Sequence, residues 1–295
     1  MKNQTKAYLL ALLAVGFWST IATAFNLSLK HISLTHLLLL ASFTAMLITG
    51  SYVFITGKNK LLKTYSLKNV LLAVLSGFIN PFLYYLILLR AYELLPAQEA
   101  GTLNYFWPVV LVLLSIPFLK QKISIKSLAA IIVSFAGIVI ISTHGNPLAM
   151  QFSNTKGVVL ALSCPFLWSL YWILNMKNPM DDVVKLFINF STGFVLILVT
   201  MLIMEELTMP SIYGILGSVY VGFFEMGITF LLWLKALKYS SSTAKISNLV
   251  FLSPFISLLF IGLLIGEEIR ISTIVGLALI IAGILLQQSF STKSA

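Results

Sequence analysis

A single carboxylate stands inside a long apolar run in the second half of the chain. Glu225 lies in the stretch GFFEMGITFLLWLKAL, residues 222–237, and the nearest other charge is Lys235. A carboxylate in hydrocarbon is costly, so such groups usually serve binding or ion transfer. Glu225 could pair with the ammonium group of an amino-acid-like or cationic solute. It could instead carry a coupling proton, because desolvation favours the neutral acid.

Aromatic and polar side chains inside other apolar runs are further candidates for binding. An aromatic lining suits an apolar, aromatic or cationic solute, through stacking and cation–π contacts. Helix packing is the alternative role for each aromatic residue. The candidate substrate-binding residues are Glu225, Asn80, Trp18, Trp168, Tyr84, Asn104, Trp107, Tyr171 and Lys245.

Prolines within the apolar runs predict where helices bend. A proline lacks the backbone N–H and clashes with the carbonyl four residues earlier, which frees a backbone acceptor. We expect bends at Pro108 and Pro254, with further ones at Pro81 and Pro165. Bent helices beside a cavity are typical of transporters that expose a site alternately.

Two charges precede the first two of these prolines by the same interval. Glu99 and Lys245 each stand nine residues before Pro108 and Pro254, respectively. We interpret Glu99 as an interfacial charge whose stem lies along the apolar surface. Lys245 fits that interpretation and a place in the vestibule of a binding site equally well.

The sequence carries none of the common signatures of catalysis or nucleotide hydrolysis. It contains no HExxH, no GxSxG and no GxxxxGK[ST] segment. His31, His36 and His144 are scattered near the ends of apolar runs, where histidines are more often solvated than bound to metal. We therefore predict no enzyme activity, no metal and no cofactor.

The composition indicates an integral membrane protein. Of 295 residues, 59% are hydrophobic and 9% charged, whereas charged residues make up about 25% of an average soluble protein. Ten apolar runs are long enough to approach the length of a bilayer crossing. They cover roughly 7–29, 34–56, 69–91, 97–119, 127–143, 157–176, 186–204, 211–234, 246–266 and 272–290. The first run begins like a secretory signal peptide, but we expect it to be the first spanning helix.

The positive charges alternate between the connections. With the N-terminus in the cytoplasm, fifteen of the 19 Lys and Arg residues fall inside and four outside. This bias predicts a multi-pass protein of the inner or plasma membrane with both termini cytoplasmic. It also explains the net charge of +10 without nucleic acid as a partner. The expected partners are the lipid bilayer and a small-molecule substrate, and the chain is expected to be a monomer or homodimer.

The two halves of the sequence align with an offset of 145–150 residues. GFWST lies over FLWSL, which pairs Trp18 with Trp168, and GFIN lies over GFFE, which pairs Asn80 with Glu225. Five segments match in this order along the chain. Five helices in each half place the second half upside down. We therefore predict an all-α membrane fold of ten helices, made of two inverted five-helix repeats at 7–143 and 157–290.

These segments resemble the drug/metabolite transporter superfamily, in its EamA-type branch. The likeness rests on GFWST (16–20), AYELLPAQEAGTLNYFWP (91–108), ALKYSSSTAKISNLVFLSP (236–254), GEEI (266–269) and GLALIIAGILL (276–286). NYFWP is similar to a motif of bacterial aromatic amino-acid exporters. The resemblance implies ten helices in two inverted repeats and export of a small metabolite.

The sequence thus predicts a secondary transporter that moves a small amino-acid-like, aromatic or cationic solute by alternating access. Transport of a sugar- or nucleotide-linked metabolite is the alternative within that class. A membrane scaffold or sensor that transports nothing is the alternative outside it.

Overall fold

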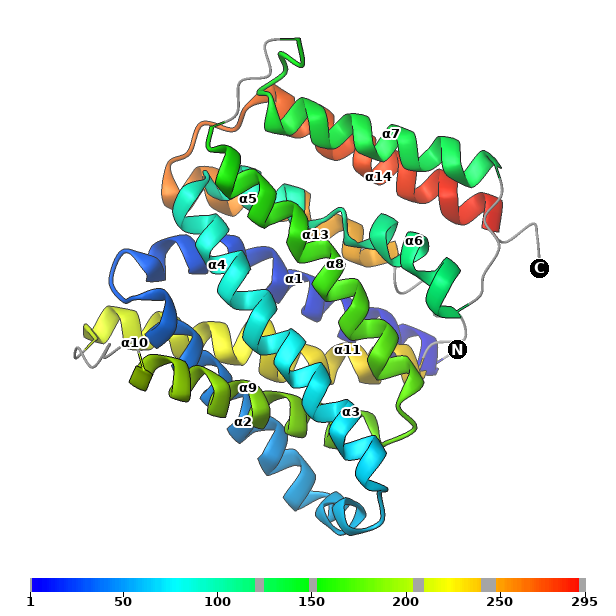
Figure 1. The fold of residues 1–295 in the computed structure, drawn as a ribbon. Helices are drawn as coiled ribbons and strands as arrows, with labels where there is room; N and C mark the ends of the chain where they lie inside the picture. The colour runs from blue at the N-terminus through cyan, green and yellow to red at the C-terminus, as the bar shows by residue number, and fades with distance from the viewer. Residues whose placement is uncertain (1, 120–124, 149–152, 204–209, 240–247, 292–295) are drawn as a thin grey trace. The chain divides into compact units, whose positions relative to one another are not determined.

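The computed structural model describes residues 2–119, 125–148, 153–203, 210–239 and 248–291, and helices joined by short connections make up these ranges (Figure 1). No residue in these ranges lies in a strand. Helices satisfy every backbone hydrogen bond internally, as a bilayer requires. The helices are α1 (Lys2–Leu29), α2 (Leu34–Ile55), η1 (Lys58–Lys63), α3 (Leu67–Gly77), η2 (Phe78–Leu83), α4 (Tyr84–Leu94), α5 (Ala97–Asn104), α6 (Trp107–Leu119), α7 (Ile125–Ser142), α8 (Thr155–Lys177), α9 (Asp182–Ile203), α10 (Ile212–Val221), η3 (Gly222–Gly227), α11 (Ile228–Tyr239), η4 (Asn248–Leu252), α13 (Ser253–Phe260), η5 (Ile261–Ile265) and α14 (Ile271–Ser291).

Seven helical stretches among the described residues are long and apolar enough to cross a membrane. They are Gln4–Leu29, Leu34–Ile55, Leu67–Leu94, Ala97–Phe118, Thr155–Lys177, Asp182–Ile203 and Ile212–Ala236. Three shorter apolar helices, Ala129–Ile141, Leu249–Ile265 and Ile271–Leu286, overlap the three other predicted runs. The all-helical, multi-pass prediction is confirmed, and the number of ten spans stays a prediction.

Serine side chains define where three of the spans begin. Ser33, Ser66 and Ser211 each have extended backbone angles and accept a hydrogen bond from the amide N–H three residues later. This bond satisfies one of the N–H groups that an α-helix leaves unpaired in its first turn. The local sequence therefore sets these helix starts before any tertiary packing.

The helices separate into two compact units. Unit 1 comprises Met1–Leu86 and Leu174–Phe260, and unit 2 comprises Ile87–Ile173 and Ile261–Ala295. Each unit therefore combines segments from both halves of the sequence. We describe each unit by itself below.

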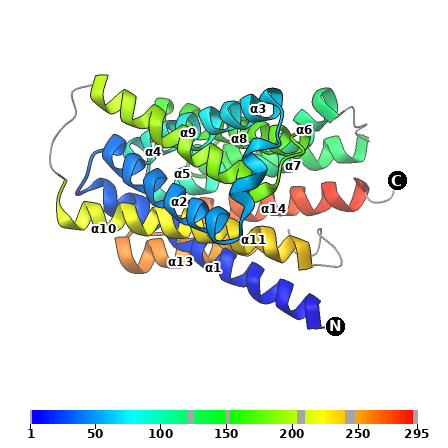
Figure 2. The same cartoon turned by 90° about the horizontal axis from the view of Figure 1, so that it is seen from below.

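Unit 1 is held together by helices from opposite halves of the chain. α2 packs along α9 (Figure 1), and α1 packs against α11 and α13 (Figure 2). Two glycines allow close approach. A Cβ on Gly77 would lie 2.6 Å from the carbonyl oxygen of Asn189, and a Cβ on Gly222 would lie 2.6 Å from that of Ala41. Any larger residue would push these helices apart.

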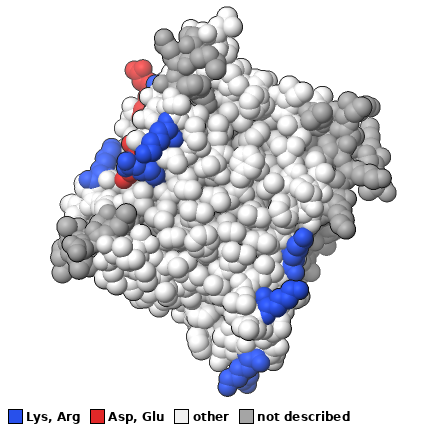
Figure 3. Space-filling view, in the orientation of Figure 1, with Lys and Arg blue, Asp and Glu red and all other residues white. Residues whose placement is uncertain are grey.

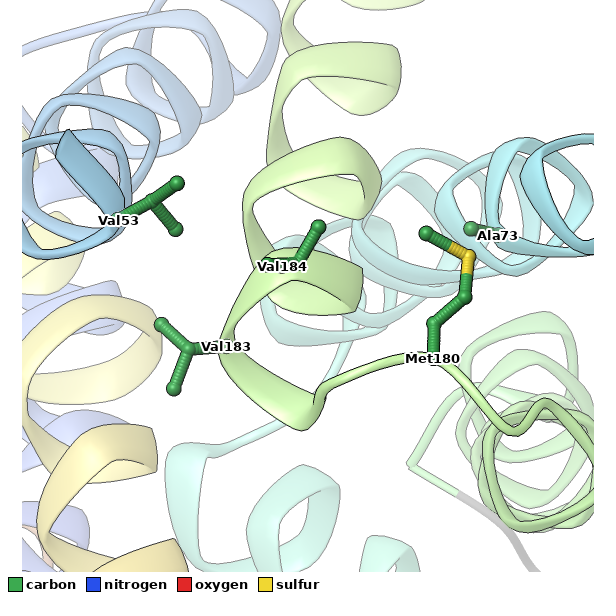
Figure 4. Close-up of a cluster of buried hydrophobic side chains, with 5 residues drawn as sticks. All are labelled: Val53, Ala73, Met180, Val183 and Val184. Carbon is green, nitrogen blue, oxygen red and sulfur yellow. The ribbon is translucent and has the colours of Figure 1, made fainter. Parts of the chain in front are cut away.

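A small apolar cluster closes one end of unit 1. Val53 from α2, Ala73 from α3, and Met180, Val183 and Val184 around the start of α9 are buried together (Figure 4). These side chains fix the beginning of α9 against α2 and α3.

An ion pair lies next to this cluster in the sequence, outside the spanning helices. Lys58 Nζ lies 2.5 Å from Asp181 Oδ2. Partial burial raises the pKa of the Asp181 carboxyl, but the hydrogen bond and charge of Lys58, with the N–H groups of Val184 and Val183, bring the pKa below its ordinary value. The carboxylate form is therefore favoured in the folded protein.

Asp181→Asn should lower stability only where Asp181 is ionised. Because the folded pKa is lowered, the stabilisation is complete above the unfolded value of about 3.9 and is lost as pH falls through the folded value. The pair is partly exposed, so we expect a loss of about 0.3–1 kcal/mol near pH 7. Thermal unfolding in detergent between pH 7 and pH 3 measures it. A deficit that stays constant down to pH 3 would contradict this explanation.

In unit 2 the closest helix pair is α7 with α14, which lie side by side in Figure 1. Ser134 Oγ donates to the carbonyl oxygen of Ile280 at 3.1 Å. A Cβ on Gly283 would lie 2.5 Å from the carbonyl oxygen of Ala130, and a Cβ on Gly137 would overlap the carbonyl oxygen of Gly276. Small residues on both helices let their backbones touch, as is typical of helix pairs in membranes.

Charged side chains are confined to helix ends on the visible face of unit 1. Figure 3 shows blue side chains at the connection between α2 and α3 and none on the white surface of α2 itself. Many exposed side chains along the spans are apolar, including Leu47, Phe54, Leu71 and Val195. This surface fits contact with lipid.

Candidate functional site

Glu225 lies in η3, a π-helical turn at the centre of the span Ile212–Ala236. The residue is 8% exposed. Its Oε1 accepts a hydrogen bond of 2.7 Å from the hydroxyl of Tyr85, which is the carboxylate's one side-chain donor among the described residues. A buried carboxylate with a single donor keeps capacity to bind a further donor or a proton.

The π-helical turn displaces the backbone carbonyls around Glu225 from the regular helix pattern. Trp18 Nε1 donates to the carbonyl oxygen of Glu225 at 3.3 Å, and Thr229 Oγ1 donates to that of Phe224 at 2.6 Å. π-helical turns inside α-helices often mark functional sites. The side chain and the backbone of Glu225 are therefore both fixed by groups from other parts of unit 1 or its own helix.

Two aromatic rings of α11 pack against the Trp18 indole. Its centroid lies 5.3 Å from that of Trp233 and 6.2 Å from that of Phe230, where the rings meet edge to face. Such contacts hold the indole in one orientation. Trp18 thus lies beside Glu225, as a candidate lining residue should.

The matched segment of the first half has the same irregularity. Asn80 lies in η2, the π-helical turn at the centre of the span Leu67–Leu94, and its backbone is extended rather than helical. Asn80 is 2% exposed, and its Nδ2 is buried without a hydrogen-bond acceptor among the described residues. An unsatisfied buried amide invites explanation, and a ligand acceptor is one.

Tyr84 and Tyr85 follow η2 and connect it to Glu225. Their ring centroids lie 4.7 Å apart, edge to face. Tyr85 is fully buried and also meets Phe25 of α1 at 6.3 Å. The sequence analysis names Tyr84 as a candidate substrate-binding residue. Its neighbour Tyr85 is the tyrosine that contacts the carboxylate of Glu225.

The remaining predicted residues with described positions lie in unit 2. Trp168 and Tyr171 contact one another, with ring centroids 6.1 Å apart, and both contact Trp172. Ser169 Oγ, beside Trp168 in the chain, donates to the carbonyl oxygen of Trp107 at 3.0 Å. Asn104 ends α5. Lys245 lies outside the described residues.

The four prolines at which the sequence predicts bends have different helix geometries in the structure. The helix is interrupted at 105–106, between α5 and α6 and just before Pro108. The helix that contains Pro254 changes from 3-10 (η4) to α (α13) just before that proline. Pro81 lies inside the π-helical η2. α8 continues through Pro165 as one α-helix.

Glu99 corrects one interpretation made from the sequence. It is not an interfacial side chain along the surface, because it is 0% exposed. Its Oε1 lies 2.6 Å from Arg270 Nη1, 2.6 Å from His144 Nε2 and 2.8 Å from Ser153 Oγ. We call these four residues the Glu99 cluster. All of them belong to unit 2.

In the described part of the chain, no group of three or more His, Cys, Asp and Glu side chains is arranged to hold a metal ion. The polar groups around Glu225 instead suit a hydrogen-bond donor or a proton.

Comparison with protein families matches one family model to each half of the chain. A family model described as the EamA-like transporter family matches residues 5–143 and again 155–287. The two matches together cover nearly the whole sequence.

Curated relatives carry transporter names. An "Uncharacterized transporter" of Clostridium kluyveri is 27% identical over 61% of this chain and 61% of its own length. "Uncharacterized transporter YvbV" of Bacillus subtilis is 25% identical over 75% of this chain and 72% of its own. One from Archaeoglobus fulgidus is 23% identical over 95% and 97%.

A crystal structure of another protein shares the fold. It superposes with a TM-score of 0.67, covers 98% of each chain and is 20% identical in sequence. At this identity the likeness concerns the fold alone.

Proposed function

Because this chain belongs to the EamA-like transporter family, we propose that it is a secondary transporter whose solute binds Glu225 through a positively charged nitrogen. The solute is a small amino-acid-like, aromatic or cationic molecule. The observation that carries this proposal is a buried mid-span carboxylate with one donor, Tyr85, beside the Trp18 indole. The carboxylate supplies charge recognition, and the aromatic rings supply stacking or cation–π contact.

The transport cycle that we propose is alternating access between two inverted repeats, 7–143 and 157–290, with ten spans. Reciprocal contacts support it, since a two-fold axis requires that a contact between i and j recurs between their equivalents. Ser19 Oγ donates to Ser253 Oγ in unit 1, while its equivalent Ser169 donates to Trp107, the equivalent of Ser253.

The glycine contacts follow the same rule. Gly77 and Gly222, which the alignment pairs, have similar surroundings: Gly77 meets Asn189 and Thr192, and Gly222 meets Ala41 and Thr44. In unit 2, α7 and α14 are themselves equivalents, and Gly137 meets Gly276 while Gly283 meets Ala130. Two matches of one family model, at 5–143 and 155–287, further support the repeat.

We place the protein in the cell membrane with both termini cytoplasmic, on the distribution of Lys and Arg between alternate connections. Export is the direction that the resemblance implies. Within unit 2, we keep Trp168, Tyr171, Trp107 and Asn104 as proposed binding residues of that unit.

Ligand identification is the direct test. Purified protein is screened by thermal unfolding against amino acids, polyamines, aromatic cations and nucleotides, since a ligand that binds only the folded state raises the melting temperature. Compounds that stabilise are then assayed for uptake into proteoliposomes. Cationic or zwitterionic amines should stabilise and be taken up. Stabilisation by nucleotides alone would instead favour a nucleotide-linked metabolite, and stabilisation without uptake would favour a sensor.

Trp18→Ala should weaken binding of the stabilising amine by about tenfold, because it removes one aromatic face worth about 1 kcal/mol or more beside the carboxylate. Binding is measured by the concentration dependence of the melting temperature, and folded yield by size-exclusion chromatography. Trp168→Ala is the matched variant from unit 2. Loss of folded protein, with affinity unchanged in what remains, would show that Trp18 only packs.

A further inference from the structure

The Glu99 cluster belongs to unit 2 and shares no residue with Glu225 and its contacts in unit 1. Three donors converge on one carboxylate oxygen, Glu99 Oε1, while Oε2 is buried and accepts no hydrogen bond among the described residues. The side chain of Glu99 is 1% exposed, whereas those of Arg270 and His144 are 41% and 31% exposed. The carboxylate is therefore buried beneath two basic groups that solvent reaches.

The cluster joins segments that are distant in the sequence. Glu99 is in the first turn of α5, His144 follows α7, Ser153 precedes α8, and Arg270 precedes α14. Three connections of the chain thus meet at one buried carboxylate. The charge distribution predicts the outer membrane face for all of them.

A second set of bonds fixes the same helix starts. Glu267 accepts from the backbone N–H groups of Ala97 and Gln98, at 2.8 and 3.3 Å. In return, Gln98 Oε1 accepts from the N–H of Arg270 at 3.1 Å and from Thr273 Oγ1 at 2.9 Å. Each helix start is capped by a side chain of the other segment. Loss of the Glu267 bonds would expose the amides of Ala97 and Gln98, and loss of the Gln98 bond would expose the amide of Arg270.

A histidine can change its charge between pH 5 and 8, whereas arginine stays charged. The charged groups of the described residues around His144 are Glu99 from α5 and Arg270 from the segment before α14, with Glu267 capping α5 beside them. A protonated ring adds the attraction between opposite charges to its hydrogen bond with the carboxylate.

We propose that the Glu99 cluster is a proton-sensitive latch, in which protonation of His144 tightens the bond to Glu99 and holds the starts of α5 and α14 together. At higher pH the neutral ring holds Glu99 less strongly, and both helix starts open more often. The consequence for transport, a response to external pH, rests on the proposed function. The latch itself does not.

Amide hydrogen exchange of the protein in nanodiscs tests the latch without any substrate. The reporters are the amides of Ala97 and Gln98, which Glu267 protects, and of Arg270, which Gln98 protects. After correction for the intrinsic effect of pH, their protection should be roughly tenfold greater at pH 6 than at pH 8. The amides capped by Ser66 and Ser211, in unit 1, serve as the internal reference.

Two variants assign the effect to the ring. His144→Gln should abolish the difference between pH 6 and pH 8, and His144→Lys, charged at both, should keep protection high at both. His31→Gln, a histidine of unit 1 that lies outside the cluster, should behave as the parent. A parent protein without the difference would overturn the proposal whatever the variants do. So would a difference that survives in His144→Gln.

Discussion

Glu225→Gln is expected to reduce uptake of the amine solute into proteoliposomes by about ten- to a hundredfold. The amide keeps the size of the side chain and can still accept from Tyr85, but it carries neither a negative charge nor a titrating proton. A hydrogen bond to a charged group contributes about 1.5–3 kcal/mol, which corresponds to this loss. If Glu225 also carries the coupling proton, the remaining uptake should no longer respond to a pH gradient.

Two further variants make the Glu225 experiment specific. Tyr85→Phe keeps the ring and removes the one side-chain donor to the carboxylate, so it should reduce uptake by less than Glu225→Gln. Glu268→Gln removes an exposed acid far along the chain and should leave uptake unchanged. Parent-like uptake with parent-like pH dependence in Glu225→Gln would refute both roles of the carboxylate.

The second large effect is expected from the helix contacts of unit 1. Gly77→Ala and Gly222→Ala should each destabilise the folded protein by about 1–3 kcal/mol, because an added methyl overlaps backbone and threonine atoms of the facing helix. If the two contacts are equivalent by symmetry, the two losses should be similar. Thermal unfolding in one detergent, at one protein concentration, provides the comparison.

Gly16→Ala is the matched control for these glycines. Gly16 lies in α1, and a Cβ there would meet no atom within 4 Å. Alanine should therefore be neutral or slightly stabilising, through its better helix propensity. Equal losses at Gly16, Gly77 and Gly222 would show that the close approach is not the cause. A loss at only one of the paired glycines would argue against the symmetry.

Features that depend on local sequence could be predicted. Apolar runs gave the helical stretches, because in a bilayer any such run must form a helix. The alignment of GFIN with GFFE selected Asn80 and Glu225, and the structure has a π-helical turn at both. The sequence predicts a bend at Pro81, next to Asn80, but it does not predict an irregular helix at Glu225.

Features that depend on packing between distant segments could not be predicted. Tyr84 and Tyr85 are adjacent residues of the same type in one apolar run, and only the fold decides which hydroxyl reaches Glu225. Glu99 stands at a helix start, where a lipid-facing and a buried carboxylate look alike. Its partners Arg270 and His144 are 171 and 45 residues away. No spacing rule joins residues so far apart.

The division of each unit between both halves of the chain has a consequence for biosynthesis. Unit 1 needs residues up to Leu86 and then residues from Leu174 to Phe260. At about 5–20 residues per second, its first three spans wait roughly ten to thirty seconds in the membrane before the last partner helix is made. During that interval Tyr85 has no Glu225 to bind. The nascent first half must therefore be sheltered by lipid or by the insertion machinery, and its own folding can be completed only late in translation.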